Sequence, residues 1–223
     1  MQMGTRNVGN PNPHKNGRNK MIRILGERIQ IRDWQLTDLD TYAHWKQPGH
    51  LWQDFDGPYY PQMLASDISA HINHLRKKIS QADWTTPRHT LIIADADTDQ
   101  LIGRLNRYWE SIETNWLSIG IVLYDPEKWS GGLGYEAFGL WTEYLFQEMP
   151  ELVRLDARTW SGNQGMMRLA EKSGYQKEAV FRKARIVKGK YYDSIGYGIL
   201  RKEWQTLYPD GFAAYIKQVK KTS

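Results

Sequence analysis

The segment KWSGGLGYEA, residues 128–137, places three glycines within four positions, immediately before a helical pattern. A tight turn explains such a cluster, because glycine adopts positive φ angles without strain. An anion site explains it equally well, because the unpaired N–H groups and the dipole at a helix N-terminus attract negative charge. The residues on both sides of the segment decide between these explanations.

The same glycines satisfy a dinucleotide-binding pattern, but they lack its context. Gly132, Gly134 and Ala137 match G-x-G-x-x-[GA], and Asp156 follows at a suitable distance. That pattern needs its first glycine directly after a strand and opens a series of parallel βαβ units. Here the residues DPEKWSG come between strand and glycine, and the segment follows an antiparallel meander. A nicotinamide or flavin site is therefore disfavoured, and the G-x-x-x-x-G-K-[ST] loop of NTPases is absent from the sequence.

Hydrophobic periodicity predicts a chain that mixes strands and helices. Alternating or apolar runs predict strands at residues 28–34, 89–95, 101–108, 117–124, 152–160, 179–187 and 191–200. Apolar spacings of three and four predict helices at about 37–47, 61–79, 134–149 and 163–173. The order is β-α-α-β-β-β-α-β-α-β-β. Short links predict antiparallel pairing of the middle strands, and the third helix predicts a parallel crossover.

The segment and its surroundings resemble the GNAT acetyltransferase superfamily. There the fourth strand leads into a loop of form [QR]-x-x-G-x-[GA] that opens a helix, and residues 129–134 match its two small positions. Trp129 in place of Gln or Arg resembles the branch of ribosomal-protein and spermidine acetyltransferases, whose loop reads roughly W-G-K-G-Y-A-T-E-A. ERIQIR at 27–32, NQGMMRLAEKSGY at 163–175 and GKYYDSIGYGILRKEW at 189–204 resemble further segments of this branch, in the same order.

The resemblance implies an α+β fold, with a mixed, mostly antiparallel twisted sheet of about seven strands and helices on both faces. It also implies acetyl-CoA as co-substrate, with its pyrophosphate on the glycine loop, where bare backbone lets N–H groups approach closely. The fourth strand of this superfamily diverges from the fifth, and the pantetheine arm pairs with its backbone. Glu136 is expected to be structural, and Asn163 also suits a helix N-cap. The expected cofactor-binding residues are Ile121, Val122, Leu123, Trp129, Ser130, Gly131, Gly132, Leu133, Gly134, Tyr135, Asn163 and Arg168.

The implied reaction is direct transfer of the acetyl group to a primary amine, which must first lose a proton. A main-chain amide of the fourth strand would polarise the thioester carbonyl. Met166 and Ala170 stand where many relatives carry a hydroxyl group. Ser161, Tyr175 or a water is then needed to protonate the leaving thiolate, unless no acid is required. Asp193, in the closing strand, is the favoured base, and Ser161 is the second catalytic candidate. No metal is expected.

The segment between the first two helices shapes the acceptor site in this superfamily. Here it combines aromatic rings with carboxylates, which suit a cationic amine, each cation–π contact contributing about 0.5–2 kcal/mol. The alternative is that these rings pack on the core. A peptide N-terminus, a polyamine and a small-molecule amine all fit, and an acyl-CoA-binding protein without efficient turnover is the alternative function. The residues expected at the acceptor site are Trp52, Asp54, Phe55, Asp56 and Tyr59.

Composition restricts the remaining classes. The chain has 223 residues and no cysteine, which excludes disulfides and a cysteine nucleophile and fits a cytoplasmic protein. No apolar run reaches the ~18 residues of a membrane helix. Residues 1–21 are rich in Asn, Gly and Pro and predict a disordered tail before one domain at 22–223. Because this tail carries most of the net charge of +5, nucleic acid is a disfavoured partner. A homodimer remains open.

Overall fold

The computed structural model describes residues 21–221, so all but the last residue of the predicted tail at 1–21 lies outside the described range. The expected order of strands and helices is confirmed, with one extra strand at the start and two extra helices at the end. The elements are β1 (Arg23–Leu25), β2 (Ile29–Arg32), α1 (Asp38–Lys46), η1 (Leu51–Asp54), α2 (Ala65–Gln81), β3 (Thr90–Asp95), β4 (Leu101–Ser111), β5 (Trp116–Leu123), η2 (Pro126–Lys128), α3 (Leu133–Glu148), β6 (Arg154–Trp160), α4 (Gln164–Lys172), β7 (Gln176–Val187), β8 (Lys190–Leu200), α5 (Arg201–Leu207) and α6 (Phe212–Lys221). No helix between residues 21 and 221 has both the length and the hydropathy that spanning a bilayer requires.

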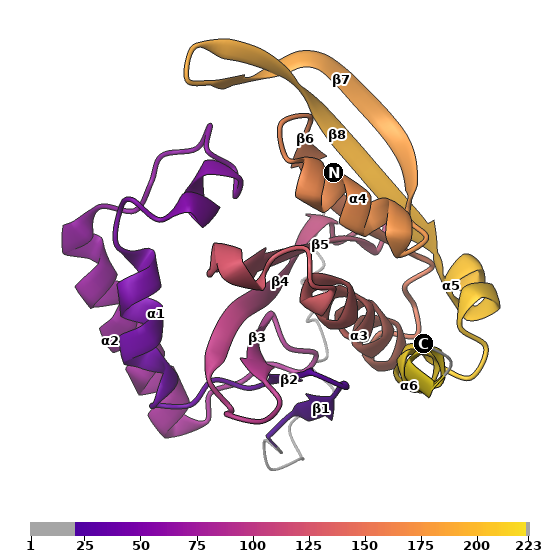
Figure 1. Ribbon diagram of the computed structural model, residues 1–223, viewed down its shortest axis with the longest axis horizontal. Coiled ribbons are helices and arrows are strands. Elements are labelled where there is room, and N and C mark those ends of the chain that lie inside the picture. Colours follow the sequence, from indigo (N-terminus) through magenta and orange to yellow (C-terminus); the bar gives the residue numbers. More distant parts are fainter. Residues whose placement is uncertain (1–20, 222–223) are drawn as a thin grey trace, which may run out of the picture.

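The strands form one eight-stranded sheet in the order β1-β2-β3-β4-β5-β6-β8-β7 (Figure 1). Every neighbouring pair is antiparallel except β5 and β6, which α3 connects as a crossover. The sheet has one strand more than the sequence predicted, because β1 pairs with β2 through a turn at Gly26. With only three residues, β1 is too short to show an alternating pattern.

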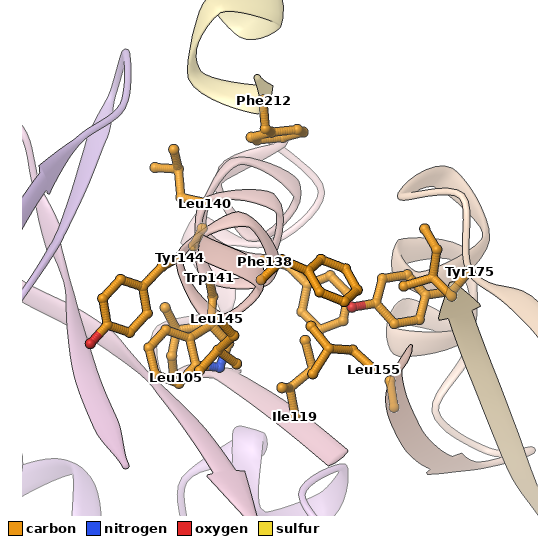
Figure 2. Packing of buried hydrophobic residues seen from close by; sticks show 14 of the residues in the cluster. Leu105, Ile119, Phe138, Leu140, Trp141, Tyr144, Leu145, Leu155, Tyr175 and Phe212 are labelled. Atoms are coloured by element: carbon orange, nitrogen blue, oxygen red, sulfur yellow. The ribbon is translucent and has the colours of Figure 1, made fainter. Parts of the chain in front are cut away.

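α3 lies over one face of the sheet and organises the larger hydrophobic core. Its Phe138 and Trp141 pack with Ile119 of β5 and Leu155 of β6 (Figure 2). Phe212 of α6 contacts the other side of α3, where its ring fills the space that a side chain at Gly139 would need. The C-terminal helix therefore completes the core, and α3 is held on both sides.

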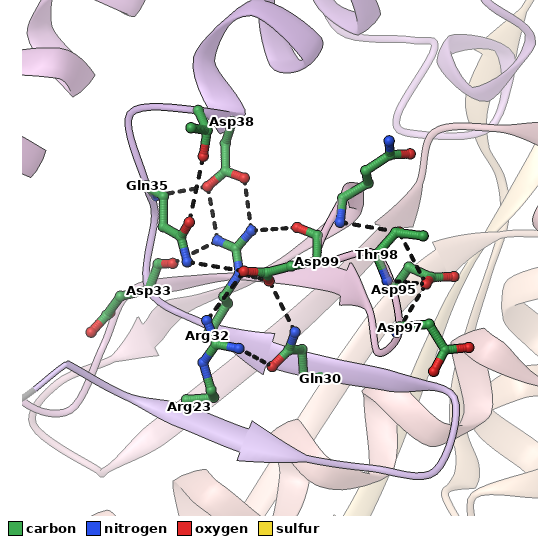
Figure 3. Close-up of polar contacts among 12 residues, drawn as sticks. Arg23, Gln30, Arg32, Asp33, Gln35, Asp38, Asp95, Asp97, Thr98 and Asp99 are labelled. Atoms are coloured by element: carbon green, nitrogen blue, oxygen red, sulfur yellow. Dashed lines mark hydrogen bonds and ion pairs between the residues drawn. The ribbon is translucent and has the colours of Figure 1, made fainter.

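α1 and α2 cover the opposite face, and a charged network fixes the start of α1 (Figure 3). Arg32 of β2 is buried and donates to the two carboxylate oxygens of Asp38 at 2.9 and 2.8 Å. It also donates to Asp99 Oδ1, in the turn between β3 and β4, at 2.6 Å. The buried guanidinium has carboxylate acceptors on both sides, so it holds the start of α1 against β2 and against the turn between β3 and β4.

β5 and β6 diverge in the middle of the sheet. They pair at three positions, from Leu117 opposite Leu155 to Ile119 opposite Ala157. Beyond this point β5 continues along β4 as far as Leu123, and β6 continues along β8. Beyond Ile119 the two strands no longer pair with each other, at the end of the sheet where the glycine loop begins; we call the region between their unpaired edges the gap.

Candidate active site

The loop before α3 turns through two residues in the left-handed region. Asp125 Oδ1 accepts a hydrogen bond from Glu127 N at 2.9 Å and starts η2. Ser130 then adopts φ +60° and Gly132 φ +86°, which favours glycine at position 132. A side chain at Gly131 would meet its nearest atom at 4.0 Å, so the backbone there is open. The loop therefore presents backbone that no side chain covers, immediately before the first turn of α3.

The N–H groups from Ser130 to Tyr135 have no hydrogen-bond acceptor within residues 21–221. The bond from Glu136 N to Gly132 O, at 3.1 Å, is the first to close a turn of α3. Free amides at a helix N-terminus carry the positive end of the dipole and form an anion site. This donor set, with open backbone beside it, fits a pyrophosphate group.

Glu136 and Arg28 join the loop to the turn between β1 and β2. Glu136 is 4% exposed, and its Oε1 accepts hydrogen bonds from the N–H groups of Glu27, Arg28 (3.0 Å) and Ile29 (3.3 Å). Glu136 therefore connects α3 to the β1–β2 turn, a structural role of a kind that the sequence, which indicated only its fit to the helix dipole, did not specify. The half-exposed Arg28 guanidinium donates to Gly131 O at 2.7 Å. It places a positive charge beside the free amides.

The divergence of β5 from β6 leaves strand backbone open next to this loop. Tyr124 N donates to Ile102 O of β4 at 3.0 Å, and successive residues of a strand direct their backbone groups to opposite sides. Val122 therefore faces β4, whereas Ile121 and Leu123 direct their N–H groups toward the gap. Of the three predicted backbone partners, Val122 has no N–H group to offer there.

Trp129 and Phe55 lie against the end of the gap. Trp129 Nε1 donates to Leu123 O at 3.0 Å, and the Phe55 ring contacts the indole edge-on, with 5.5 Å between centroids. Phe55 O accepts from Trp160 Nε1 at 3.1 Å and from Asn163 Nδ2 at 3.2 Å. The segment after η1 therefore reaches the end of β6 and brings the α1 side of the molecule to the glycine loop.

The predicted cofactor residues of α4 have different surroundings. Asn163 Oδ1 accepts a hydrogen bond from Met166 N at 2.9 Å, which confirms the helix-capping alternative. Because its Nδ2 bonds Phe55, both polar atoms of Asn163 already have partners. Arg168 is exposed on the same helix. Contact of either residue with a cofactor stays a prediction.

The predicted proton-transfer residues have structural partners. Asp193 Oδ1 accepts from Lys183 N at 2.8 Å, at an irregularity of β7 where Lys183 has φ +56°. Ser161 Oγ accepts from Asp193 N at 3.0 Å, which ties the end of β6 to β8. The Tyr175 hydroxyl contacts Thr142 Oγ1 at 2.8 Å in the core, and burial raises the pKa of Tyr175. Tyr175 is thus a core residue, and catalytic roles for Asp193 and Ser161 stay predictions.

Trp52 of the predicted acceptor segment belongs to the core. It is 4% exposed, and its Nε1 donates to Trp45 O at 3.0 Å. Its ring packs with Tyr124 in the cluster beneath α1 and α2. Packing on the core, the alternative that the sequence left open, therefore holds for Trp52.

The rest of the segment contacts the β7–β8 hairpin. Asp54 Oδ2 lies 3.0 Å from Lys188 Nζ, and the Arg185 guanidinium lies 4.5 Å from the centroid of the Tyr59 ring. Asp56 is exposed and forms no ion pair with a described residue. The two segments, more than a hundred residues apart in sequence, are thus in contact, and a role of Asp54, Phe55, Asp56 and Tyr59 in acceptor binding stays a prediction.

Known proteins match this chain over most of its length. A family model described as an acetyltransferase (GNAT) domain matches residues 28–176. The chain belongs to the GNAT acetyltransferase family. The uncharacterized N-acetyltransferase p20 of Bacillus licheniformis is 26% identical over 185 residues, covering 82% of this chain and 99% of p20. A GNAT-family acetyltransferase of Bacillus anthracis has a TM-score of 0.64 at 21% identity, over 81% of this chain and 99% of its own. A Vibrio cholerae protein described as a candidate ribosomal-protein-serine acetyltransferase has a TM-score of 0.56 at 19% identity, over 80% and 97%.

The sequence did not indicate two cations of this GNAT domain: Arg28, beside the glycine loop, and Arg104 of β4, whose Nε is buried without a hydrogen-bond partner in the part of the chain that the structure describes. Arg28 belongs to an ordinary alternating strand pattern, and nothing in that pattern places it beside the glycine loop. Arg104 had one signal, a charge inside the apolar run LIGRL of β4. Among residues 21–221, no group of three or more His, Asp and Glu side chains is placed to hold a metal ion.

Proposed function

We propose that this GNAT protein transfers the acetyl group of acetyl-CoA to a primary amine. The observation that carries the proposal is the run of free N–H groups from Ser130 to Tyr135, beside the gap between β5 and β6. Acetyl-CoA supplies an activated acetyl thioester. The free amides hold its pyrophosphate, and the α3 dipole and the Arg28 guanidinium add to the attraction.

The backbone of β5 orients and polarises the reacting carbonyl. Ile121 and Leu123 direct N–H groups into the gap, whereas Leu123 O is already bonded to Trp129. An N–H group aimed at the carbonyl oxygen stabilises the negative charge that develops as the amine nitrogen attacks. The C–N bond then forms, the thioester C–S bond breaks, and the amine releases a proton.

Proton transfer in this site depends on solvent more than on a dedicated side chain. Asp193 and Ser161 are bonded to Lys183 and to each other, which favours structural roles. A water that reaches the gap accepts the proton of the amine. The thiolate leaves without an acid, because a thiol has a pKa of about 8.5 and its anion is a stable leaving group.

Binding of acyl-CoA without efficient turnover is the second candidate function. It is favoured by the face of α4 that follows Asn163, where Met166 is partly buried and Ala170 is fully buried. This face therefore has no hydroxyl group to protonate a leaving thiolate. The two functions share the acetyl-CoA site and differ only in turnover.

Thermal melting with acetyl-CoA tests the shared site. Gly131→Glu places a carboxylate among the free amides, at a position where a side chain meets no close atom; Gly131→Ala is its matched control. The wild type and Gly131→Ala are expected to melt several degrees higher with acetyl-CoA, and Gly131→Glu to show no shift. A wild type that acetyl-CoA does not stabilise would contradict both functions.

Release of free CoA separates the enzyme from the binding protein. The acceptors are peptide N-termini, polyamines and small amines, each incubated with acetyl-CoA and either wild type or Gly131→Glu. CoA release that needs both an amine and an intact Gly131 supports acetyl transfer. Stabilisation by acetyl-CoA with no release for any amine supports the binding protein instead.

A further inference from the structure

Cations of this chain already lie over two of the three aromatic rings expected to hold a cationic amine. Lys46 Nζ lies 5.3 Å from the centroid of the Trp52 ring, and the Arg185 guanidinium lies 4.5 Å from that of Tyr59. Asp54 is likewise paired with a lysine of the hairpin. A polyamine would therefore meet like charge at these positions, which disfavours its binding.

Arg104 of β4 is the opposite case, a cation without a partner. Its guanidinium forms no hydrogen bond or ion pair with any residue of 21–221, and its Nε is buried. Nε is its only donor that is both buried and unbonded, so the two Nη groups reach solvent. A partly buried cation without a counter-charge is costly, and an anion that accepts from both Nη groups would offset that cost.

The surroundings of Arg104 add positive charge and little negative charge. Burial lowers the pKa of Lys46, and Arg104 lowers it further; burial also lowers the pKa of His71, with help from the same two cations. Asp56 is the carboxylate that acts on both Arg104 and Lys46, but it forms no ion pair with either in the described chain. The Tyr124 hydroxyl is buried there without a hydrogen-bond partner.

This group of residues lies one strand away from the gap. Arg104 is opposite Val122 in the register of β4 and β5, and Val122 belongs to the cluster beneath α1 and α2. Opposed residues of paired strands share a face, so the Arg104 side chain lies on the α1 side. Neighbouring strands are about 4.8 Å apart, so the backbone of Arg104 is separated from the unpaired edge of β5 by the width of a single strand.

We propose that Arg104, assisted by Lys46, binds a carboxylate of the acceptor, so that the substrates are amines with an acidic group a few bonds from the nitrogen. The inference rests on the proposed acetyltransferase function and names its acceptor class. Two free Nη groups in one plane match the two oxygens of a carboxylate. The Tyr124 hydroxyl supplies a further donor at the same place.

Amine acceptors with and without a carboxylate test this assignment. The set contains ω-amino acids of two to six carbons, their carboxamides, spermidine and phosphoethanolamine. Wild type is expected to prefer a carboxylate over its carboxamide by about tenfold to a hundredfold in kcat/KM, the range of a hydrogen bond between charged groups. Arg104→Met should abolish the preference, and Arg104→Lys should keep part of it. Arg158→Met is the matched control, because Arg158 of β6 already pairs with Glu110 at 2.7 Å; its preference should not change.

Several outcomes would overturn the proposal. These are a wild type that uses carboxamides or spermidine as well as carboxylates, and a folded Arg104→Met that keeps the preference. A preference for phosphoethanolamine would assign a phosphate to Arg104 and overturn the carboxylate. If Arg104→Met does not fold, Arg104→Lys decides, because an unchanged preference in that variant contradicts a bidentate contact.

A binding measurement separates this proposal from the proposed function. Calorimetry with CoA present compares N-acetyl ω-amino acids with their carboxamides and requires no turnover. Tighter binding of the carboxylates, lost in Arg104→Met, supports the role of Arg104 even in a protein that transfers no acetyl group. Equal binding of both series overturns it, while failure of acetyl-CoA itself to bind contradicts the proposed function instead.

Discussion

The glycine loop and the acceptor side of this GNAT domain are built from different groups. On the loop, residues 129–135, the proposed binding groups are backbone amides left free by the geometry of a helix start. On the α1 side of the sheet the proposed binding groups are the side chains of Arg104 and Lys46, which come from two separate segments. Ligand binding by backbone amides requires positions without a bulky side chain. Ligand binding by charged side chains requires charges that are not already paired within the protein, so substitutions should affect the two sites differently.

Removal of Arg32 should have the largest effect, because it breaks the attachment of the acceptor side to the sheet. Arg32→Met leaves the Asp38 carboxylate buried without its counter-charge and should lower the free energy of unfolding by about 3–5 kcal/mol. Urea denaturation measures this loss. Arg23→Met is the control, since Arg23 contacts Asp99 at 3.2 Å from an exposed position and should cost less than about 1 kcal/mol. Equal losses would contradict the account.

Removal of Glu136 should weaken the loop side by a smaller amount. Glu136→Ala leaves the buried Ile29 N–H and its neighbours without their acceptor, which should cost about 2–3 kcal/mol of unfolding free energy. Glu136→Gln keeps an oxygen at the same place and should cost less. The same denaturation experiment checks both variants. A Gln variant as unstable as the Ala variant would show that these hydrogen bonds are not what Glu136 contributes.

Arg28 should affect ligand binding more than stability, because its ion pair with Glu136 Oε2, at 3.7 Å, involves a half-exposed guanidinium and should be worth less than about 1 kcal/mol. Arg28→Met removes the guanidinium beside the free amides and should weaken acetyl-CoA binding about tenfold, or ~1.4 kcal/mol, while Arg28→Lys keeps part of the affinity. Calorimetry at two salt concentrations measures the effect, which should shrink as salt rises. Arg182→Met, an exposed substitution on β7, is the control and should bind as the wild type does. Unchanged affinity in Arg28→Met would remove Arg28 from the site.

The contact between the hairpin and the acceptor segment should matter least for stability. Lys188 and Asp54 form an ion pair at 3.0 Å whose side chains are 74% and 47% exposed, so Lys188→Ala should cost less than about 0.5 kcal/mol. Urea denaturation of Lys188→Ala and of the neighbouring exposed Lys190→Ala should give nearly equal values. A loss above about 1 kcal/mol in Lys188→Ala alone would show that this ion pair stabilises the fold more than an exposed contact should.

The sequence predicted the parts of the fold that local periodicity determines. The order of strands and helices through β8 follows from apolar spacing and short links, and the structure confirms it. β1 was missed because three residues carry no pattern. α5 was missed because only its first four residues fall within the last segment that the family resemblance covered, and α6 lies wholly beyond that segment. Phe212 shows the consequence, since its place against Gly139 depends on a contact between distant parts of the chain.

The candidate site likewise contains residues that the sequence could indicate and residues that it could not. Glycine spacing before a helix is a local signal, so the sequence could indicate the loop. Trp52 looked like an acceptor residue because an aromatic ring in a turn-rich segment has no local mark of burial, yet it packs in the core. Arg28 and Arg104 lie beside residues that are 18 or more positions away in sequence, such as Gly131 and Val122, so only the folded chain reveals their surroundings.

The proposed function depends on the free amides from Ser130 to Tyr135 binding the pyrophosphate of CoA. Amide proton and nitrogen chemical shifts of the isotope-labelled protein test it directly, with CoA compared against pantetheine, which lacks the pyrophosphate. The account predicts that CoA moves the amide proton signals of these residues strongly downfield and that pantetheine does not. CoA that binds but leaves these signals in place, while shifting others, would contradict the account.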